Sequence, residues 1–212
     1  MSRTGRPVGA TAGLEGAAVD LYWLPLGAGG HSVRLNGRVF EAVAARAARR
    51  PACDLYHSAL DVRVGATRFA IEQAPVRDAY GDQRGVVAEG SVGTGWAGRF
   101  QIFRYEIRRW RDGRIPDIDE AVGSPLRLTD DEAPAQRVLD LVPHVPTPVW
   151  GRDELKTGDM WNSNSVTAWL IARSGIDTES IHPPTAGRAP GWQAGLVAAR
   201  RAEADMPPAL SP

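Results

Sequence analysis

Two consecutive segments of the chain alternate between apolar and polar positions, with a glycine between them. They are DLYHSALDVRV (residues 54–64) and TRFAIEQAPV (residues 67–76), separated by Gly65 and Ala66. Alternation with a period of two is typical of β-strands, and the glycine favours a tight turn. The pattern therefore predicts a β-hairpin. In its first strand one face carries Leu55, His57, Ala59 and Asp61, and the other carries Tyr56, Ser58, Leu60, Val62 and Val64.

Three further segments have strand-like composition. They are AVDLYWLPLG (residues 18–27), ended by Pro25 and Gly27, VVAEGSV (residues 86–92) and the aromatic-rich RFQIFRYEIRRW (residues 99–110). Branched and aromatic side chains favour extended backbone, and the proline and glycine mark an end.

Helical periodicity appears in four places. We expect helices over 39–50, over 131–142, directly after WNSNS (residues 161–165), and in the last apolar run of PPTAGRAPGWQAGLVAARR (residues 183–201). The order of elements predicts an α+β fold, in which helices pack on an antiparallel sheet. We expect residues 18–204 to form a single domain, residues 1–17 a disordered N-terminal segment, and residues 205–212 a flexible tail.

Composition excludes several classes of function. The 25 basic and 25 acidic residues balance, which disfavours nucleic acid and membrane as partners. A single cysteine, Cys53, excludes an internal disulfide and a cysteine-cage metal site, and no histidine pair has ligand spacing, so we expect no metal and no cofactor. The first residues lack a signal-peptide core and no stretch is long enough to span a bilayer, which predicts a cytoplasmic protein.

The run Asn162-Ser163-Asn164-Ser165 stands directly before an apolar helical pattern. Asn and Ser are preferred N-caps, which explains one of the four residues. No Glu or Gln follows three residues after either serine, so we expect no capping box. The other interpretation is that Ser163 is a nucleophile, since backbone donors at a helix N-terminus stabilise developing negative charge.

A nucleophilic serine needs a base. His31, His144 and His182 fall in predicted loops, whereas His57 lies within a predicted strand. The next strand supplies Glu72 and Gln73 as candidates to orient the imidazole. The register of the hairpin, which the sequence leaves open, decides between them.

The segments LYHSALDV, RFAIEQAP and WNSNSVTAWLI, in that order, resemble the circularly permuted papain-like proteins, the NlpC-related group that includes lecithin:retinol acyltransferase-like enzymes. The resemblance implies that Ser163 replaces the catalytic cysteine, that His57 is the base and that Glu72 is the third member. The implied substrate groove comprises Asn162, Asn164, Tyr56, Gln73, Arg188 and Trp192. The stretches GRFQIFRYEIRRW, TPVWGRDELKTGDMWNSNS and GRAPGWQAGL also resemble a bacterial protein family.

A serine in the cysteine position leaves two functions open. The first is a hydrolase or acyltransferase that acts on an amide, ester or thioester of a small-molecule or peptide-like substrate. The second is a non-catalytic binding module that keeps the papain-like groove, because a motif defines a geometry and not an activity. The sequence does not predict the oligomeric state.

Overall fold

The computed structural model of the chain describes residues 16–26, 45–46, 49, 51–76, 85–93, 95 and 103–205. Apart from residues 16, 17 and 205, the predicted disordered segment 1–17 and the predicted tail 205–212 lie outside these residues. So does most of the predicted helix 39–50, of which Ala45 and Arg46 are described and helical.

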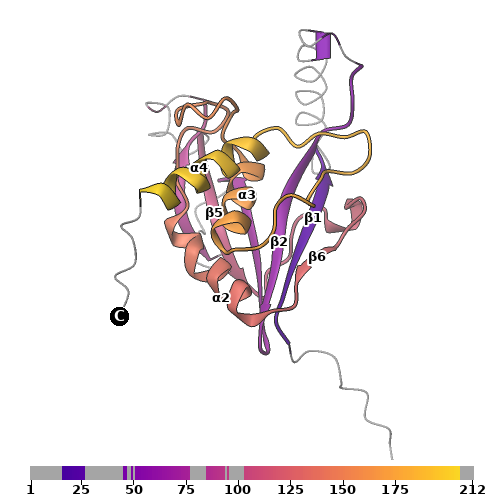
Figure 1. Cartoon of the computed structure of the whole chain (residues 1–212), viewed down its shortest axis with the longest axis vertical. Helices are drawn as coiled ribbons and strands as arrows, with labels where there is room; N and C mark the ends of the chain where they lie inside the picture. Colours follow the sequence, from indigo (N-terminus) through magenta and orange to yellow (C-terminus); the bar gives the residue numbers. More distant parts are fainter. Residues whose placement is uncertain are drawn as a thin grey trace, which may run out of the picture.

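The described residues form a six-stranded antiparallel sheet in the order β4-β5-β3-β2-β1-β6 (Figure 1). The strands are β1 (Ala18–Pro25), β2 (Tyr56–Val64), β3 (Thr67–Pro75), β4 (Val86–Ser91), β5 (Arg104–Arg111) and β6 (Leu126–Thr129). Three helices, α2 (Glu132–Leu141), α3 (Ser163–Arg173) and α4 (Trp192–Ala204), follow along the chain. The predicted α+β fold, with an antiparallel sheet and helices packed on it, is confirmed.

The predicted hairpin is β2–β3. Its turn contains Gly65, whose φ of 57° belongs to the left-handed region that glycine adopts without strain. The register pairs Leu60 with Ile71 and Val64 with Thr67. Edge strand β6 was not predicted, because only four residues extend beside β1 and two of them are exposed, so no alternating pattern develops.

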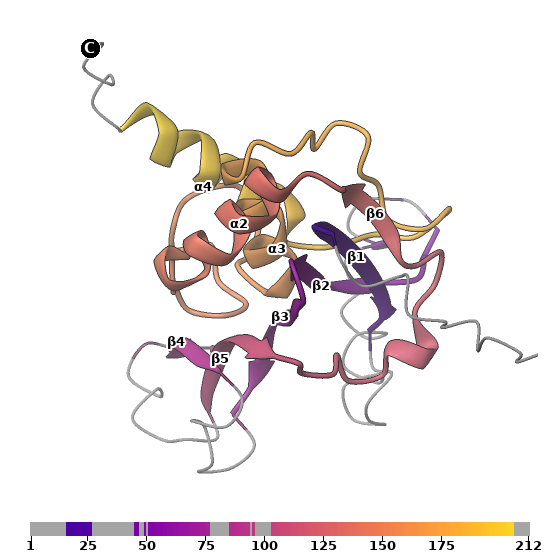
Figure 2. The ribbon, with the colours of Figure 1, turned by 90° about the horizontal axis from the view of Figure 1, so that it is seen from below.

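All three helices lie on one side of the sheet, and the connection from β5 to β6 passes on the other side (Figure 2). Alternate residues of the central strands therefore belong to two separate cores. The large core joins the helices to side chains such as Leu21, Leu60, Ile71 and Ile107. Burial of this apolar surface is the main source of stability for the arrangement.

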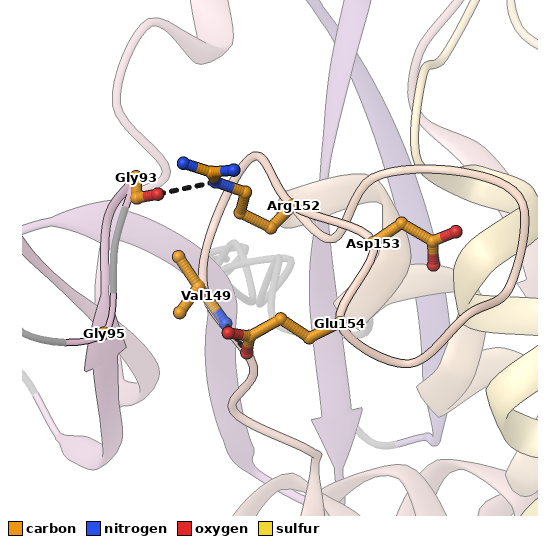
Figure 3. A pocket seen from close by; sticks show the side chains of 6 residues that line it. All are labelled: Gly93, Gly95, Val149, Arg152, Asp153 and Glu154. Carbon is orange, nitrogen blue, oxygen red and sulfur yellow. Dashed lines mark hydrogen bonds between the residues drawn. The ribbon is translucent and has the colours of Figure 1, made fainter.

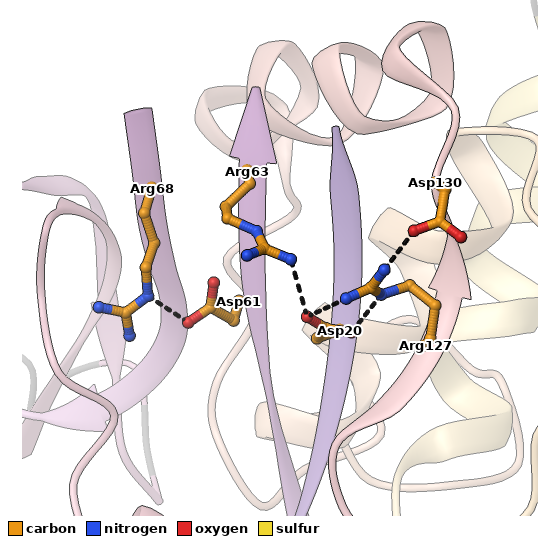
Figure 4. A network of polar contacts seen from close by, with 6 residues as sticks. All are labelled: Asp20, Asp61, Arg63, Arg68, Arg127 and Asp130. Carbon is orange, nitrogen blue, oxygen red and sulfur yellow. Dashed lines mark hydrogen bonds and ion pairs between the residues drawn. The ribbon is translucent and has the colours of Figure 1, made fainter. Parts of the chain in front are cut away.

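The opposite face of the sheet combines a small apolar cluster with a row of charges. Leu24, Ala59, Ala70 and Ile115 form the cluster, against which Ile118 of the 3-10 helix η4 (Ile118–Glu120) also packs. The charges alternate in sign across four strands, as Figure 4 shows for Asp20, Asp61, Arg63, Arg68, Arg127 and Asp130.

Within this row the carboxylates of Asp20 and Asp61 are buried, and the arginines lie over them. Arg127 Nε donates to Asp20 at 2.6 Å, and Arg68 Nε donates to Asp61 at 2.5 Å. Burial raises the pKa of Asp61, and the hydrogen bond from Arg68 acts in the opposite direction. Because each acid has a cationic partner, the row crosslinks neighbouring strands rather than presenting unpaired charge.

Candidate functional site

Helix α3 begins at Ser163, with Asn162 as an extended N-cap. The Asn162 side chain accepts a hydrogen bond from the Asn164 N–H at 2.9 Å, and the Ser165 hydroxyl accepts one from the Asn162 N–H at 3.1 Å. This reciprocal pair is a capping box, so the prediction that none would form was wrong. Serine at the third position replaces the usual Glu or Gln, because its short hydroxyl is close enough to reach back to the cap.

Asn164 ties the helix to the sheet. Its Nδ2 donates to the carbonyl oxygens of Tyr56 at 2.9 Å and of Pro190 at 2.8 Å, and its Oδ1 accepts from the Ser58 hydroxyl at 2.9 Å. Asn164 is 2% exposed. A buried amide with all these partners fixes the start of α3 against β2 and against the loop before α4.

The loop before α4 is held by the same polar run. The Ser165 hydroxyl donates to the Gly191 carbonyl at 2.7 Å, and Asn162 Nδ2 donates to the Pro190 carbonyl at 2.9 Å. Gly191 has a φ of 87°, and a Cβ built on it would lie 2.4 Å from Asn162 Oδ1. The close approach of loop and cap therefore requires glycine at this position.

Ser163 differs from its three neighbours. Its side chain is 5% exposed, and its hydroxyl has no hydrogen-bond partner within the part of the chain that the structure describes. It is thus buried at the first position of α3, without a structural bond that would account for it.

His57 lies on the other face of the sheet from α3. Its neighbours Tyr56 and Ser58 face the helices, and alternation points His57 the opposite way. It pairs in register with Leu24, a member of the small apolar cluster on that opposite face. The structure therefore does not bring the His57 imidazole to the Ser163 hydroxyl.

The imidazole of His57 is also poorly basic. Burial lowers the pKa of His57 to about 4, although the nearby carboxylate of Asp117 acts in the opposite direction. At neutral pH the ring is uncharged. A general base works best with a pKa near the operating pH, and His57 lies well below it.

Glu72 shares the face of His57 and is held by another partner. It pairs in register with Arg108, whose Nη1 donates to Glu72 Oε1 at 2.6 Å, while the Arg108 Nε donates to Glu106. All three side chains are buried. Ser163, His57 and Glu72 therefore do not assemble into one site in this structure.

Gln73 takes the helix-facing side of β3, because it follows Glu72 by one residue and pairs with Ile107 of the large core. It is 5% exposed, and neither its Oε1 nor its Nε2 has a hydrogen-bond partner among the described residues. Gln73 is one of the predicted groove residues, but no pattern in the sequence indicates that its amide is buried without a partner.

The remaining predicted groove residues have structural positions beside the start of α3. Tyr56 is buried in the large core, and its N–H donates to the Arg188 carbonyl at 2.8 Å. Trp192 packs on Trp23 of β1, with ring centroids 5.1 Å apart. Tyr56, Asn162, Asn164 and Trp192 thus all lie where α3, β2 and the loop before α4 meet. They contact the protein itself there.

An open cavity of about 450 Å³ lies elsewhere, where the segment 149–154 passes the end of β4. Gly93, Gly95, Val149, Arg152, Asp153 and Glu154 line it (Figure 3). Arg152 Nε donates to the Gly93 carbonyl at 2.7 Å, which leaves the two Nη groups without a partner among the described residues. In the sequence, this segment contributed only to a family resemblance and predicted no cavity, because the lining comes from two loops far apart in the chain.

The acidic side chains at this cavity shape the segment 149–158. Glu154 accepts from the Val149 N–H at 2.8 Å, and Asp153 accepts from the N–H groups of Thr157 and Gly158. These hydrogen bonds lower the pKa of Asp153. The lining of the cavity therefore combines the guanidinium of Arg152 with the carboxyl groups of Asp153 and Glu154.

Comparisons with known proteins add no family to this geometry. No protein-family model matches the chain, and no curated protein and no solved structure matches it. None of the helices in the described part has the length and apolar content that crossing a bilayer requires.

Proposed function

We propose that the chain is a non-catalytic binding protein built on a papain-like scaffold. The separation of Ser163 from His57 and Glu72 by the sheet carries this proposal. Serine is a weak nucleophile unless a base lies within hydrogen-bond reach of its hydroxyl. The neighbours of Ser163 support the same reading, because their side chains are engaged in the joint between α3, β2 and the loop before α4.

The ligand of this binding protein occupies the open cavity at Arg152. Its volume falls within the range of small-molecule sites. The Nη groups of Arg152 suit a carboxylate, and Glu154 and Asp153 supply the opposite charge a short way along the same segment. This pattern favours a zwitterionic, peptide-like ligand over a simple anion or cation.

A labelling experiment tests the absence of catalysis. An alkyl fluorophosphonate reacts with activated serines, so we expect wild-type protein to remain unlabelled at Ser163 under conditions that label a serine hydrolase fully. Peptide mapping by mass spectrometry gives the readout. Labelling at Ser163 that disappears in His57→Ala would show an active site and overturn the proposal.

A titration tests the binding. Glycylglycine, followed by calorimetry, is expected to bind saturably to the wild type and to Ser163→Ala with equal affinity. Arg152→Gln should weaken binding about tenfold or more, because it removes the guanidinium. Arg111→Gln is the matched control, since Arg111 is 71% exposed on β5. Equal binding by Arg152→Gln and the wild type would contradict the assignment of the cavity.

A further inference from the structure

Among the described residues, Gln73 is the side chain with two buried polar atoms that have no hydrogen-bond partner. A carboxamide has two donors and one acceptor to satisfy, and buried groups of this kind nearly always have partners. Gln73 is 5% exposed, and both its oxygen and its nitrogen lack a partner in the described chain. A side chain kept in this state at a cost in stability points to a partner that comes from outside the chain.

Gln73 is level with the first turn of α3. The pairing of β2 with β3 ends at Leu60 and Ile71, and Ser58 and Gln73 each lie two residues beyond that pair on their own strands. Ser58 contacts the first residues of α3. Its hydroxyl donates to Asn164, and its carbonyl accepts from Thr167. The Gln73 side chain therefore projects from the sheet towards the N-terminus of α3.

Ser163 is on the side of α3 that faces β3. Asn164 and Thr167 point to β2, and Ser165 points to the loop before α4. Ser163, Val166 and Leu170 lie on another side of α3, about one hundred degrees around the helix axis from the side that faces β2. Helix α3 also contacts β3. Both atoms of the Gln73 amide on β3 are buried without a partner, and the hydroxyl of Ser163, a buried residue of α3, makes no hydrogen bond to the described residues.

We propose that Gln73 and the first turn of α3 form an internal binding site for a neutral carboxamide group. An amide is the best complement to Gln73, because it offers a donor and an acceptor side by side, as Gln73 does. The Ser163 hydroxyl adds a donor for the second lone pair of the ligand carbonyl, and the positive end of the helix dipole favours the carbonyl oxygen there. A carboxylate would satisfy the donors and leave Gln73 Oε1 facing negative charge.

This site goes beyond the proposed function, since it shares no residue with the cavity at Arg152 and takes an uncharged ligand. Either can fail without the other. Loss of glycylglycine binding in Arg152→Gln concerns the cavity, whereas the response of Gln73 to an uncharged amide concerns the internal site.

Nuclear magnetic resonance of the ¹⁵N-labelled chain tests the internal site. The Gln73 side-chain NH₂ signals are assigned as those missing from Gln73→Met, and N-acetylglycinamide is then titrated in. We expect these signals to shift saturably, while sodium acetate at the same concentration leaves them unchanged. Gln136→Met, at an exposed glutamine of α2, is the matched control and should bind as the wild type does.

Two variants separate a binding role from a merely structural one. Gln73→Met should abolish the amide response elsewhere in the spectrum and raise the unfolding temperature, because it removes an unpaired buried polar group. Ser163→Ala should weaken amide binding about tenfold and keep the fold. An unmoved Gln73 signal up to about 0.1 M amide, a response to acetate in place of the amide, or unchanged affinity in Ser163→Ala would overturn the proposal.

Discussion

Ser163 and Asn164 are adjacent in the chain, yet their side chains have different relations to the fold. Asn164 makes three hydrogen bonds that join α3 to β2 and to the loop before α4. Ser163 is also buried, but its hydroxyl makes no hydrogen bond to the described residues. A polar residue that contributes nothing to the framework around it is a candidate for ligand contact, whereas its neighbour is a framework residue.

Removal of the Asn164 side chain should therefore destabilise the protein strongly. We expect Asn164→Ala to lower the free energy of unfolding by about 3 kcal/mol, because it deprives the buried Tyr56 carbonyl and the Ser58 hydroxyl of a partner. Ser163→Ala should stay within about 0.5 kcal/mol of the wild type. Urea denaturation measures both. A large loss in Ser163→Ala would show that the Ser163 hydroxyl supports the fold and would contradict this assignment.

His57 predicts a dependence of stability on pH. Its pKa is about 4 in the folded protein and about 6.5 when unfolded, so the unfolded chain binds more protons between these values. Stability is complete above the unfolded pKa and falls as the pH drops towards the folded one. From pH 7.5 to pH 5 we expect the wild type to lose about 2 kcal/mol more than His57→Gln.

Chemical denaturation of both proteins at the two pH values gives this difference directly. An equal loss in the wild type and in His57→Gln would show that the imidazole is freely solvated. A smaller loss in the wild type would mean that the folded protein favours the charged ring, as a base paired with an acid would.

At the scale of elements, α3 and α4 meet at a joint made by one polar run and one glycine. The Gly191 carbonyl accepts from Ser165, and its N–H donates to Asp159 at 2.7 Å. The cap residue Asn162 lies where a Gly191 side chain would be. The start of α3 and the start of α4 are therefore positioned together, and a change in either shifts both.

Two glycines with nearly the same backbone angle test this joint. Gly158 has a φ of 89° and open space around its Cα, whereas Gly191 has a φ of 87° and faces Asn162. Gly158→Ala should cost about 1 kcal/mol of stability from backbone strain alone. Gly191→Ala should cost at least about 1 kcal/mol more, because it also displaces the cap. Equal costs in thermal unfolding would contradict the close packing.

At the scale of the whole molecule, the sheet has two unlike faces. One face carries the large apolar core under the helices, and the other carries charges that are buried in pairs or larger groups. Arg108 contacts both Glu72 and Glu106 on that second face. Buried charges of this kind contribute little net stability when paired, but removing one partner is costly.

We therefore expect Arg108→Met to destabilise the protein by about 3–5 kcal/mol, since it leaves two buried carboxylates without the guanidinium that contacts them both. Arg111→Met, on the same strand but exposed, should change stability by less than about 0.5 kcal/mol. Guanidinium chloride denaturation distinguishes the two variants. A similar small effect in both would mean that the charges on this face are solvated.

The periodicity of the chain was enough to predict five strands of the sheet, three of its helices and the α+β class. It could not predict which face of the hairpin the helices would cover. Apolar residues occur on both faces of β2, with Leu55 and Ala59 on one and Leu60 and Val62 on the other. The position of His57 depends on that choice, so alternation alone could not decide whether it meets Ser163.

The capping box at the start of α3 was not predicted, for a different reason. The expected capping box had Glu or Gln at its third position, and a serine performs that role here. The polar run of residues 162–165 therefore makes more structural hydrogen bonds than its composition indicated. The unpartnered amide of Gln73 could not be predicted either, because it depends on how α3 crosses β3 and not on any local pattern.

The ionisation of a thiol placed at position 163 shows whether His57 acts on this position. Ser163→Cys is made in a Cys53→Ala background, and the rate of alkylation by iodoacetamide is measured against pH, with and without His57→Ala. Because the sheet separates His57 from position 163, we expect the same thiol pKa in both proteins. A thiol pKa well below about 8.5 that rises when His57 is removed would show a working pair and contradict this expectation.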